Sequence, residues 1–265
     1  MAEIQFEQML DGTPIAYRED GGGDALGRCG FFWLGGFNSD MDGAKAETIA
    51  TLARDTRRPS LRFDYSGQGK SGGLFVDGTI SIWLEQAAHM FTKRNSGRRI
   101  VIGSSMGGWL ALLLLRKLLT HDRAAAARIA GLVLIAPAAD MTADLMWDAF
   151  PREVRAELAE KGVWMRPSLY GEPYPITAKL IEDGHRHLVL RRGLDCPCPV
   201  RILQGDADQD VPASHAMKVF EAVRGADIAL TLIKGGDHRL SSPTHLATIR
   251  ATALRLAERA DGISV

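Results

Sequence analysis

The sequence predicts an α/β fold in which a mostly parallel central sheet carries helices on both faces. Three observations predict it. Short apolar runs alternate with longer stretches in which apolar residues recur at helical spacing. The runs are apolar throughout, as expected for parallel strands that helices cover on both sides. A Gly-x-Ser-x-Gly motif also falls where one such run passes into a helical stretch.

The chain begins with two strand-like runs, 4–10 and 13–18, on either side of Asp11-Gly12. An Asp-Gly pair between two such runs is a strong signal for a tight turn. We therefore expect an antiparallel amino-terminal hairpin.

Six apolar runs after the hairpin predict buried strands, at 31–34, 61–65, 100–102, 132–135, 200–203 and 228–233. The stretches between and after them predict helices, at 46–54, 80–91, 107–119, 213–223 and 244–259. In the helix at 80–91 the apolar side chains form one stripe. Ser242 and Pro243 are a favourable N-cap and first residue for the last helix.

Residues 140–195 break this alternation, because they contain no convincing buried strand. They are rich in aromatic, methionine and proline residues, and they include Trp147, Trp164 and Met165. A loop of this length inside a compact domain usually has structure and purpose of its own. We expect a single domain over 1–265 with 140–195 as a cap insertion over the sheet edge. Trp147, Trp164 and Met165 are candidate substrate-binding residues, and a cap packed only for stability is the alternative.

Composition limits the classes of function. With 265 residues and 46% hydrophobic content, the chain can build the core of one large domain or two small ones, which excludes disorder. Lys plus Arg and Asp plus Glu both total 32, so the formal charge is zero. We therefore expect neither nucleic-acid binding nor binding to anionic membranes as the main activity.

The compartment is predicted from the cysteines and the amino-terminal residues. Cys29, Cys196 and Cys198 are an odd set, and the last two are too close in sequence for an ordinary disulfide. The first residues match neither a secretory signal nor a transit peptide. No run reaches the roughly 18 apolar residues of a membrane span. These features predict a cytoplasmic location; they leave the oligomeric state open.

Ser105 is the candidate nucleophile. It is the central residue of Gly103-Ser104-Ser105-Met106-Gly107, which lies between a predicted strand and a predicted helix. Glycines two residues on either side leave room for a sharp turn that holds the serine on a strained corner at a helix amino terminus. A glycine-rich turn with two incidental serines is the alternative.

A serine hydroxyl needs a base, usually a histidine oriented by a carboxylate. His238 follows the last predicted strand after Gly235-Gly236, which allow the chain to bend back over the strand ends. The other histidines are better explained as partly exposed residues of helices or as members of a solvated loop, and they are His89, His121, His185, His187, His215 and His245.

The acid should follow the strand at 200–203, where Asp206, Asp208 and Asp210 are available. Asp208 is the candidate that orients His238, and Asp206 and Asp210 are expected to be capping or turn residues. The order serine, acid, histidine along the chain is the order of the α/β-hydrolases and not of the serine proteases.

The tetrahedral oxyanion needs backbone N–H donors. The residue after the nucleophile, Met106, is one candidate, and a residue that follows the first parallel strand is the other. We assign the second donor to Phe37, with Asn38 as a near competitor. Gly35-Gly36 serving only as a turn is the remaining alternative.

Three motifs suggest a cofactor or metal site, but the residues around each motif argue against such a site. The Gly-x-Gly-x-x-Gly run at 67–72 is not followed at once by a helix, and Asp64 stands where a phosphate-binding loop needs glycine. The aspartates at 206–210 lack the glycine and glutamate of a calcium loop. His185 and His187 have no third ligand in the sequence nearby. We expect no cofactor and no metal.

Five segments carry a resemblance to a known family, namely 64–67, 103–110, 161–164, 198–201 and 237–239. The chain resembles the α/β-hydrolases and, over nearly its whole length, the group typified by abhydrolase domain-containing protein ten. The resemblance implies an α/β-hydrolase fold with Ser105, Asp208 and His238 as the triad. It also implies serine-dependent removal of fatty acyl groups from protein cysteines, or hydrolysis of acyl-glucuronides. The chain departs from the group in having no transit segment and around 34–38.

The leading hypothesis is a serine hydrolase that cleaves acyl thioesters or carboxylic esters through an acyl-enzyme. Its substrate would be a small acyl ester or thioester or an acylated protein, and protein depalmitoylation is one such activity. A general carboxylesterase or an acyl-glucuronide esterase is the alternative with the same residues. An alternative of a different class is a catalytically silent binding module on the same fold.

Overall fold

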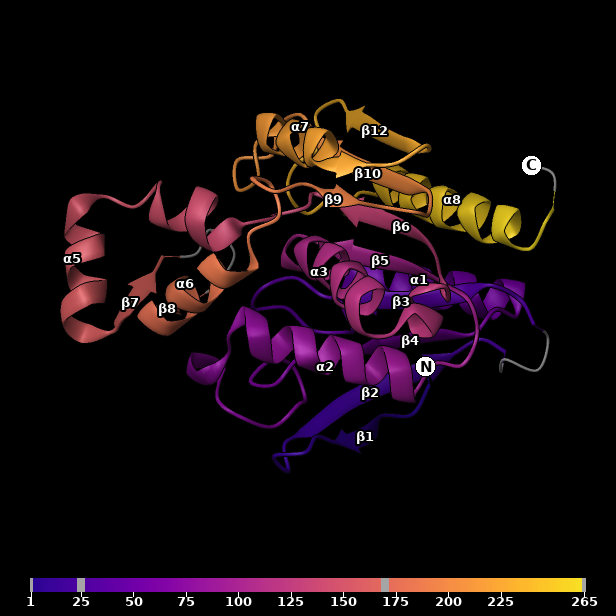
Figure 1. Ribbon diagram of the computed structural model, residues 1–265, viewed down its shortest axis with the longest axis horizontal. Coiled ribbons are helices and arrows are strands. Elements are labelled where there is room, and N and C mark those ends of the chain that lie inside the picture. The colour runs from indigo at the N-terminus through magenta and orange to yellow at the C-terminus, as the bar shows by residue number, and fades with distance from the viewer. Residues whose placement is uncertain (1, 23–26, 168–171, 264–265) are drawn as a thin grey trace.

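The computed structural model describes residues 2–22, 27–167 and 172–263. Its main sheet has eight strands in the order β1-β2-β4-β3-β5-β6-β10-β12 (Figure 1). Their bounds are β1 Gln5–Gln8, β2 Pro14–Asp20, β3 Gly30–Leu34, β4 Ser60–Phe63, β5 Arg99–Ser104, β6 Ile129–Ile135, β10 Val200–Gly205 and β12 Ile228–Ile233. The predicted amino-terminal hairpin is confirmed: β1 pairs antiparallel with β2, and β2 pairs antiparallel with β4.

The other pairs of the main sheet are parallel, which confirms the predicted mostly parallel sheet. All six apolar runs form strands. β12 differs from the prediction of a buried strand, because its residues are only half-buried or exposed. Among the described residues it is the last strand at one edge of the sheet, so β10 is its only neighbouring strand.

Helices cover both faces of the sheet, as predicted. On one face α1 (Ala44–Thr56) and α8 (Pro243–Ala260) pack against the sheet in one apolar cluster. On the other face lie α2 (Ile80–Lys93), α3 (Met106–His121) and α7 (Ala213–Ala222), within a second cluster. The Ser242 hydroxyl caps α8 by accepting from the His245 N–H at 3.2 Å, and Pro243 occupies its first turn, as the sequence predicts.

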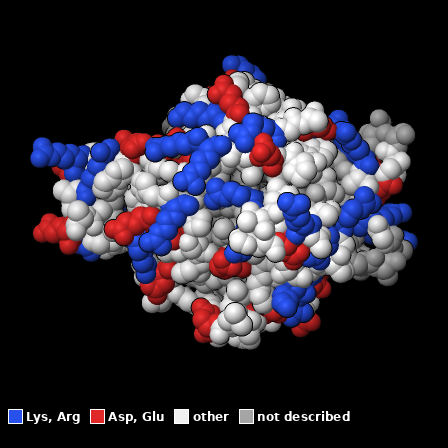
Figure 2. All heavy atoms as spheres, viewed as in Figure 1, with Lys and Arg blue, Asp and Glu red and all other residues white. Residues whose placement is uncertain are grey.

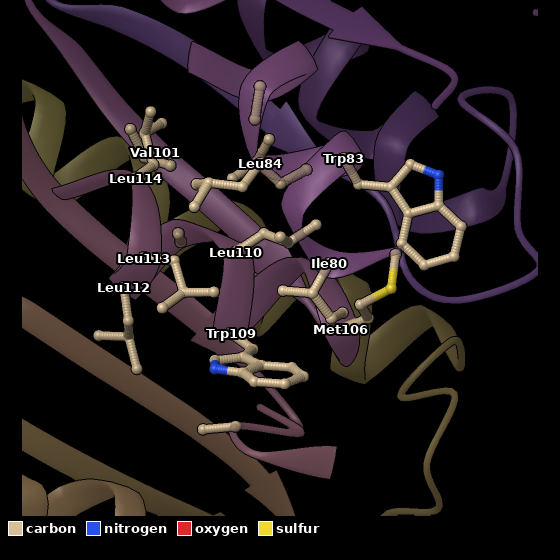
Figure 3. Close-up of a cluster of buried hydrophobic side chains, with 14 of the residues drawn as sticks. Ile80, Trp83, Leu84, Val101, Met106, Trp109, Leu110, Leu112, Leu113 and Leu114 are labelled. Carbon is tan, nitrogen blue, oxygen red and sulfur yellow. The ribbon is translucent and has the colours of Figure 1, made fainter. Parts of the chain in front are cut away.

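The core between α2 and α3 fixes the helix that begins at Ser105. Figure 3 shows Ile80, Trp83 and Leu84 of α2 close to Met106 and Leu110 of α3, with Val101 of β5 nearby. These side chains are buried almost completely. Because so much apolar surface is removed from water there, the start of α3 is held firmly against the sheet.

The segment 140–195 extends to one side of the sheet and its helices (Figure 1). It contains η3 (Thr142–Trp147), α5 (Arg152–Lys161), β7 (Val163–Arg166), β8 (Tyr174–Thr177), α6 (Ala178–Gly184), η4 (His185–His187) and β9 (Leu194–Asp195). The antiparallel pair β7–β8 is a feature that the sequence does not predict. Each of its strands has four residues, too few to show a clear alternation, and Pro175 interrupts the second.

Three short elements complete the description: α4 (Arg123–Ala126), η2 (Phe75–Asp77) and β11 (Val223–Arg224), which pairs with β9. Figure 2 shows basic and acidic side chains interspersed over the face that it presents. Within the described ranges, every helix is too short or too polar to cross a lipid bilayer.

Candidate active site

Ser105 lies at the sharp turn between β5 and α3. Its backbone has φ +56° and ψ −119°, a conformation that residues other than glycine rarely adopt. The neighbouring glycines are required by space: a Cβ on Gly103 would lie 2.2 Å from the Gly107 carbonyl oxygen, and one on Gly107 would lie 2.1 Å from the Leu34 carbonyl oxygen. The motif therefore contains glycine because β3, β5 and α3 meet there without room for a side chain.

The structure brings Ser105, His238 and Asp208 into one hydrogen-bonded chain. Nδ1 of His238 is 2.9 Å from Oδ2 of Asp208, and Nε2 is 3.1 Å from the Ser105 hydroxyl oxygen. An ionised carboxylate accepts and cannot donate, so the proton of the neutral ring belongs on Nδ1. Nε2 can then accept the hydroxyl proton. The three side chains come from turns that follow β5, β10 and β12.

Asp208 is held as a carboxylate. Burial raises the pKa of this carboxyl, but hydrogen bonds from His238, from the Val211 N–H and from Gln204 outweigh burial and leave the pKa below its usual value. Its Oδ1 accepts from the N–H groups of Asp210 and Val211 at 2.9 and 2.8 Å. The charge and orientation of Asp208 are therefore fixed by the backbone around it.

The two neighbouring aspartates have other roles. Asp206 accepts from the Gly235 N–H at 2.6 Å and pairs with Lys234, so it holds the turn before His238, as expected of a turn residue. Asp210 brings an oxygen within 4.8 Å of the ligand atoms of Asp208 and His238. Such a set could bind a cation, but both oxygens of Asp208 already accept hydrogen bonds. The donor set does not fit a metal centre well.

The turn that follows β3 lies against Ser105, where the oxyanion donors were expected. A Cβ on Gly36 would be 3.5 Å from the Cβ of Ser105. Phe37 and Asn38 both line a cavity at Ser105. The ring of Phe37 packs against Trp83 and Tyr174. Met106 is the first residue of α3, so its N–H has no partner within the helix.

The first cavity, of about 750 Å³, opens between Ser105 and the segment 140–195. Its apolar wall includes Phe75, Met141, Leu145, Met146 and Tyr174. The carboxyl ends of parallel strands are the usual place for ligands in such sheets, and this cavity lies there.

The structure does not bring Trp147, Trp164 and Met165 to this cavity. The Trp147 ring lies under the Arg155 guanidinium, and the Trp164 ring packs at 5.1 Å against Phe150. Met165 is 52% exposed. The neighbouring residues Met146 and Arg166 line the cavity instead. Without β7 and η3 in the prediction, the direction of each side chain could not be assigned from the sequence.

Four other histidines contact groups outside the Ser105 site. His89 pairs with Glu7, and His215 lies 2.8 Å from the Ala139 carbonyl oxygen. His185 and His187 contact Ile181 and Ser81 separately, not a shared centre.

The glycine-rich run 67–72 is a structural loop. Asp64 accepts from the backbone N–H groups of Met41 and Lys70 at 2.6 and 2.8 Å. A Cβ on Gly69 would lie 2.1 Å from an Asp64 oxygen, so the loop closes tightly on this carboxylate.

Sequence reasoning missed Lys45. It lies in the first turn of α1 and lines a second cavity beside Ser105. Its Nζ donates to the Arg239 carbonyl. A lysine in the first turn of an amphipathic helix is indistinguishable in sequence from a solvated one, so the pattern held no signal for it.

Comparisons with known proteins agree with this fold. The model of the alpha/beta hydrolase family matches residues 27–249. Palmitoyl-protein thioesterase ABHD10, mitochondrial, from Homo sapiens is 33% identical over 216 residues, which cover 80% of this chain and 67% of that protein.

Solved structures agree as well. One from Agrobacterium vitis S4 superposes with a TM-score of 0.89 at 42% identity and covers 97% of this chain and 99% of that chain. Alpha/beta hydrolase domain-containing protein 10 from mouse superposes with a TM-score of 0.84 at 28% identity, also over 97% and 99%. The resemblance predicted from the sequence is thereby confirmed.

One prediction is corrected by the same relatives. The prediction of a cytoplasmic location is wrong on this comparison, because the curated relatives are named as mitochondrial proteins. The sequence argument used cysteine content and the first residues, and neither determines a compartment.

The fold, the family match and the relatives also confirm the prediction of an enzyme of the hydrolase class. The chain belongs to the alpha/beta hydrolase family.

Proposed function

We propose that the chain hydrolyses acyl thioesters and carboxylic esters through an acyl-enzyme on Ser105. The observation that carries this proposal is the continuous chain of hydrogen bonds from Ser105 through His238 to Asp208. The relatives named palmitoyl-protein thioesterase support a fatty acyl thioester as substrate. Acylated proteins and small acyl thioesters both belong to that class.

In the first half of the reaction, His238 Nε2 accepts the proton of the Ser105 hydroxyl as its oxygen attacks the acyl carbonyl. A tetrahedral intermediate forms, and its oxyanion takes hydrogen bonds from the backbone N–H groups of Met106 and Phe37. Asp208 keeps the ring oriented and stabilises its positive charge. The bond from carbon to the sulfur or oxygen of the leaving group then breaks, and His238 gives its proton to that atom.

In the second half, His238 takes a proton from water, and the resulting hydroxide attacks the acyl-enzyme. The second tetrahedral intermediate collapses, His238 returns the proton to Ser105, and the carboxylic acid leaves. Phe75, Leu145 and Met146 give the first cavity an apolar wall on which an acyl chain can lie.

A fluorophosphonate probe tests the nucleophile. The wild-type protein should be labelled, and Ser105→Ala should lose the label completely. Ser214→Ala is the matched control, because Ser214 is an exposed serine of α7. Retained labelling of Ser105→Ala would move the nucleophile to another serine and contradict the proposal.

The substrate class is tested by hydrolysis rates of a thioester and an oxyester with the same acyl chain. A higher kcat/KM for the thioester supports the thioesterase assignment. A clear preference for the oxyester would favour the general carboxylesterase, which uses the same residues.

A further inference from the structure

The turn after β3 supplies the proposed oxyanion donor, the Phe37 N–H, which belongs to the peptide unit that joins Gly36 to Phe37. This unit lies next to the nucleophile, since a Cβ on Gly36 would be 3.5 Å from the Cβ of Ser105. The unit is trans. A trans peptide unit is planar, and its C=O and N–H point in opposite directions. Whatever holds the Gly36 carbonyl therefore also sets the direction of the Phe37 N–H.

The side chain of Ser39 holds that carbonyl. Its hydroxyl donates to the Gly36 carbonyl oxygen at 2.9 Å. In an ordinary β-turn, the backbone N–H of the last residue makes this contact. Here the Ser39 N–H donates instead to Oε1 of Gln68 at 3.1 Å. Asn38 has φ +52°, a conformation that asparagine adopts more readily than most residues. The turn is therefore closed by one hydroxyl group, which a single substitution can remove.

The backbone of Ser39 is held from the loop 64–71. Gln68, which accepts from the Ser39 N–H, is only 5% exposed, so its side chain has little room to move. Further along the chain, the Met41 N–H donates to Asp64 at 2.6 Å. Because these contacts fix the backbone that follows the turn, the Ser39 hydroxyl is held at a defined place below the Gly36 carbonyl.

The same contacts distinguish between the two candidate donors of this turn. The Asn38 N–H belongs to the next peptide unit, whose carbonyl is that of Phe37. Within the described parts of the chain, no hydrogen bond reaches the Phe37 carbonyl. An effective oxyanion donor is oriented before the charge develops, because it then needs no reorganisation during the reaction. The unit that carries the Phe37 N–H meets this condition through Ser39.

We propose that Ser39 is a positioning residue for the oxyanion hole, and that its hydroxyl aims the Phe37 N–H at the oxyanion formed on Ser105. The inference rests on the proposed function and goes beyond it by giving a residue outside the triad a part in the reaction. Ser39 acts through Phe37 and takes no proton itself. Without the hydroxyl the peptide unit tilts more freely, and a misaligned N–H makes a weaker hydrogen bond.

Two inhibitors test the inference, namely octyl trifluoromethyl ketone and the corresponding alcohol. With the ketone, the Ser105 oxygen bonds to the carbonyl carbon, and His238 takes the hydroxyl proton. The electron pair of the C=O bond moves to the carbonyl oxygen, which becomes an oxyanion. The alcohol has the same alkyl chain but cannot form this adduct. The Ki of the alcohol divided by that of the ketone therefore reports on the adduct, and in the wild-type protein it should be at least about 100.

Variants of Ser39 assign part of this ratio to the hydroxyl. Ser39→Ala and Ser39→Val should each lower the ratio by about tenfold, which is part of the loss expected when a whole oxyanion donor is removed. Ser39→Thr keeps a hydroxyl and should keep the ratio of the wild type. Threonine and valine have nearly the same shape, so their comparison isolates the hydroxyl. Ser214→Ala, which changes an exposed serine of α7, should leave the ratio unchanged.

The kcat/KM for an octanoyl thioester should follow the same order, with Ser39→Thr above Ser39→Val, because substrate and ketone both form an oxyanion on Ser105. Each Ki ratio is internal to one variant, so a general loss of stability does not change it. Equal Ki ratios or equal kcat/KM values in Ser39→Thr and Ser39→Val would overturn the inference while the proposed function stands. If the wild-type protein hydrolyses neither thioester nor ester, the proposed function fails and the inference fails with it.

Discussion

Ser105 owes its position to a strained backbone. Its φ of +56° turns the hydroxyl out of the β5–α3 corner toward His238, 3.1 Å away. Strain of this kind persists only where the surroundings enforce it, and here Gly103 and Gly107 pack without side chains. The reactive geometry is therefore present before substrate binds.

Asp208→Asn should lower kcat by about four orders of magnitude, because an amide can donate to Nδ1 and so favours the wrong tautomer of His238. Steady-state hydrolysis of octanoyl thioester measures the effect. Asp206→Asn is the matched control, since Asp206 accepts from the Gly235 N–H and does not contact His238. A kcat for Asp208→Asn close to that of the control would remove Asp208 from the mechanism.

The corner between β5 and α3 depends on close backbone approach. Three elements meet there, since the Gly107 Cα faces the carbonyl of Leu34 in β3. The first turn of α3 is also fixed by Met106 and Leu110, which pack against α2 (Figure 3). A change at this corner should affect both stability and the site.

Gly107→Ala should lower the free energy of unfolding by about 3 kcal/mol, as overpacking against backbone commonly does. The added Cβ would lie 2.1 Å from the Leu34 carbonyl oxygen, which cannot move without moving β3. Urea denaturation followed by circular dichroism measures it. Gly43→Ala, where the nearest atom is 3.7 Å away, is the comparison, and equal midpoints for the two variants would argue against the corner as described.

The strands and helices of the main sheet could be predicted because each carries a long local signal. An apolar run such as 132–135 predicts a buried strand because all of its side chains are apolar. The Ser242-Pro243 pair predicts the start of α8. The motif at Ser105 predicted its turn because the turn brings backbone segments so close together that glycine is required two residues before and two residues after the serine. The order serine, acid, histidine then limited the partners to two loops.

The rest depended on distances that a sequence does not contain. β7 and β8 pair with each other, and neither strand has a recognisable alternation of apolar and polar residues. Trp147 packs against Arg155 and Trp164 packs against Phe150, and neither ring lines the cavity. On a short helix or strand, a shift of one residue in the boundary changes the direction in which a side chain points. Lys45 reaches the site only through the fold, as α1 begins beside the loop of His238.

Buried polar contacts hold the two ends of segment 140–195 together and join the segment to α2. Asp140 accepts from the N–H groups of Val189 and Leu190, at 2.7 and 3.0 Å. Asp183 accepts from the N–H and the hydroxyl of Ser81 at the start of α2, both at 2.7 Å. His187 lies 2.7 Å from the same hydroxyl. The cavity above Ser105 therefore depends on contacts that are far apart along the chain.

Two histidines in this region, the buried His215 beside Ala139 and the half-buried His187 beside Ser81, should make the molecule less stable in weak acid when they titrate. Burial lowers the pKa of His215 and of His187. Asp144 and Lys218 also act on His215, and Asp183, Arg116, Arg186 and Glu85 act on His187. The folded state binds these protons less readily than the unfolded state, whose histidines have a pKa of about 6.5. Stability is therefore complete above pH 6.5, roughly, and is lost as pH falls below it.

Thermal unfolding between pH 7.5 and 5, from about 1 unit above the histidine value to about 1.5 units below it, measures this loss. His215→Gln should reduce the slope of stability against pH, by at most about 1.4 kcal/mol per unit for one proton. His121→Gln, which changes an exposed histidine at the end of α3, should leave the slope as it is. A slope in His215→Gln equal to that of the wild type would exclude this histidine as a source.

The acyl-enzyme is tested by quenching the protein in acid during turnover of octanoyl thioester and locating the bound acyl group by peptide mass spectrometry. The account predicts an octanoyl group on Ser105, absent in Ser105→Ala. Turnover with the octanoyl group on another residue, or at a rate that Ser105→Ala leaves unchanged, would contradict it.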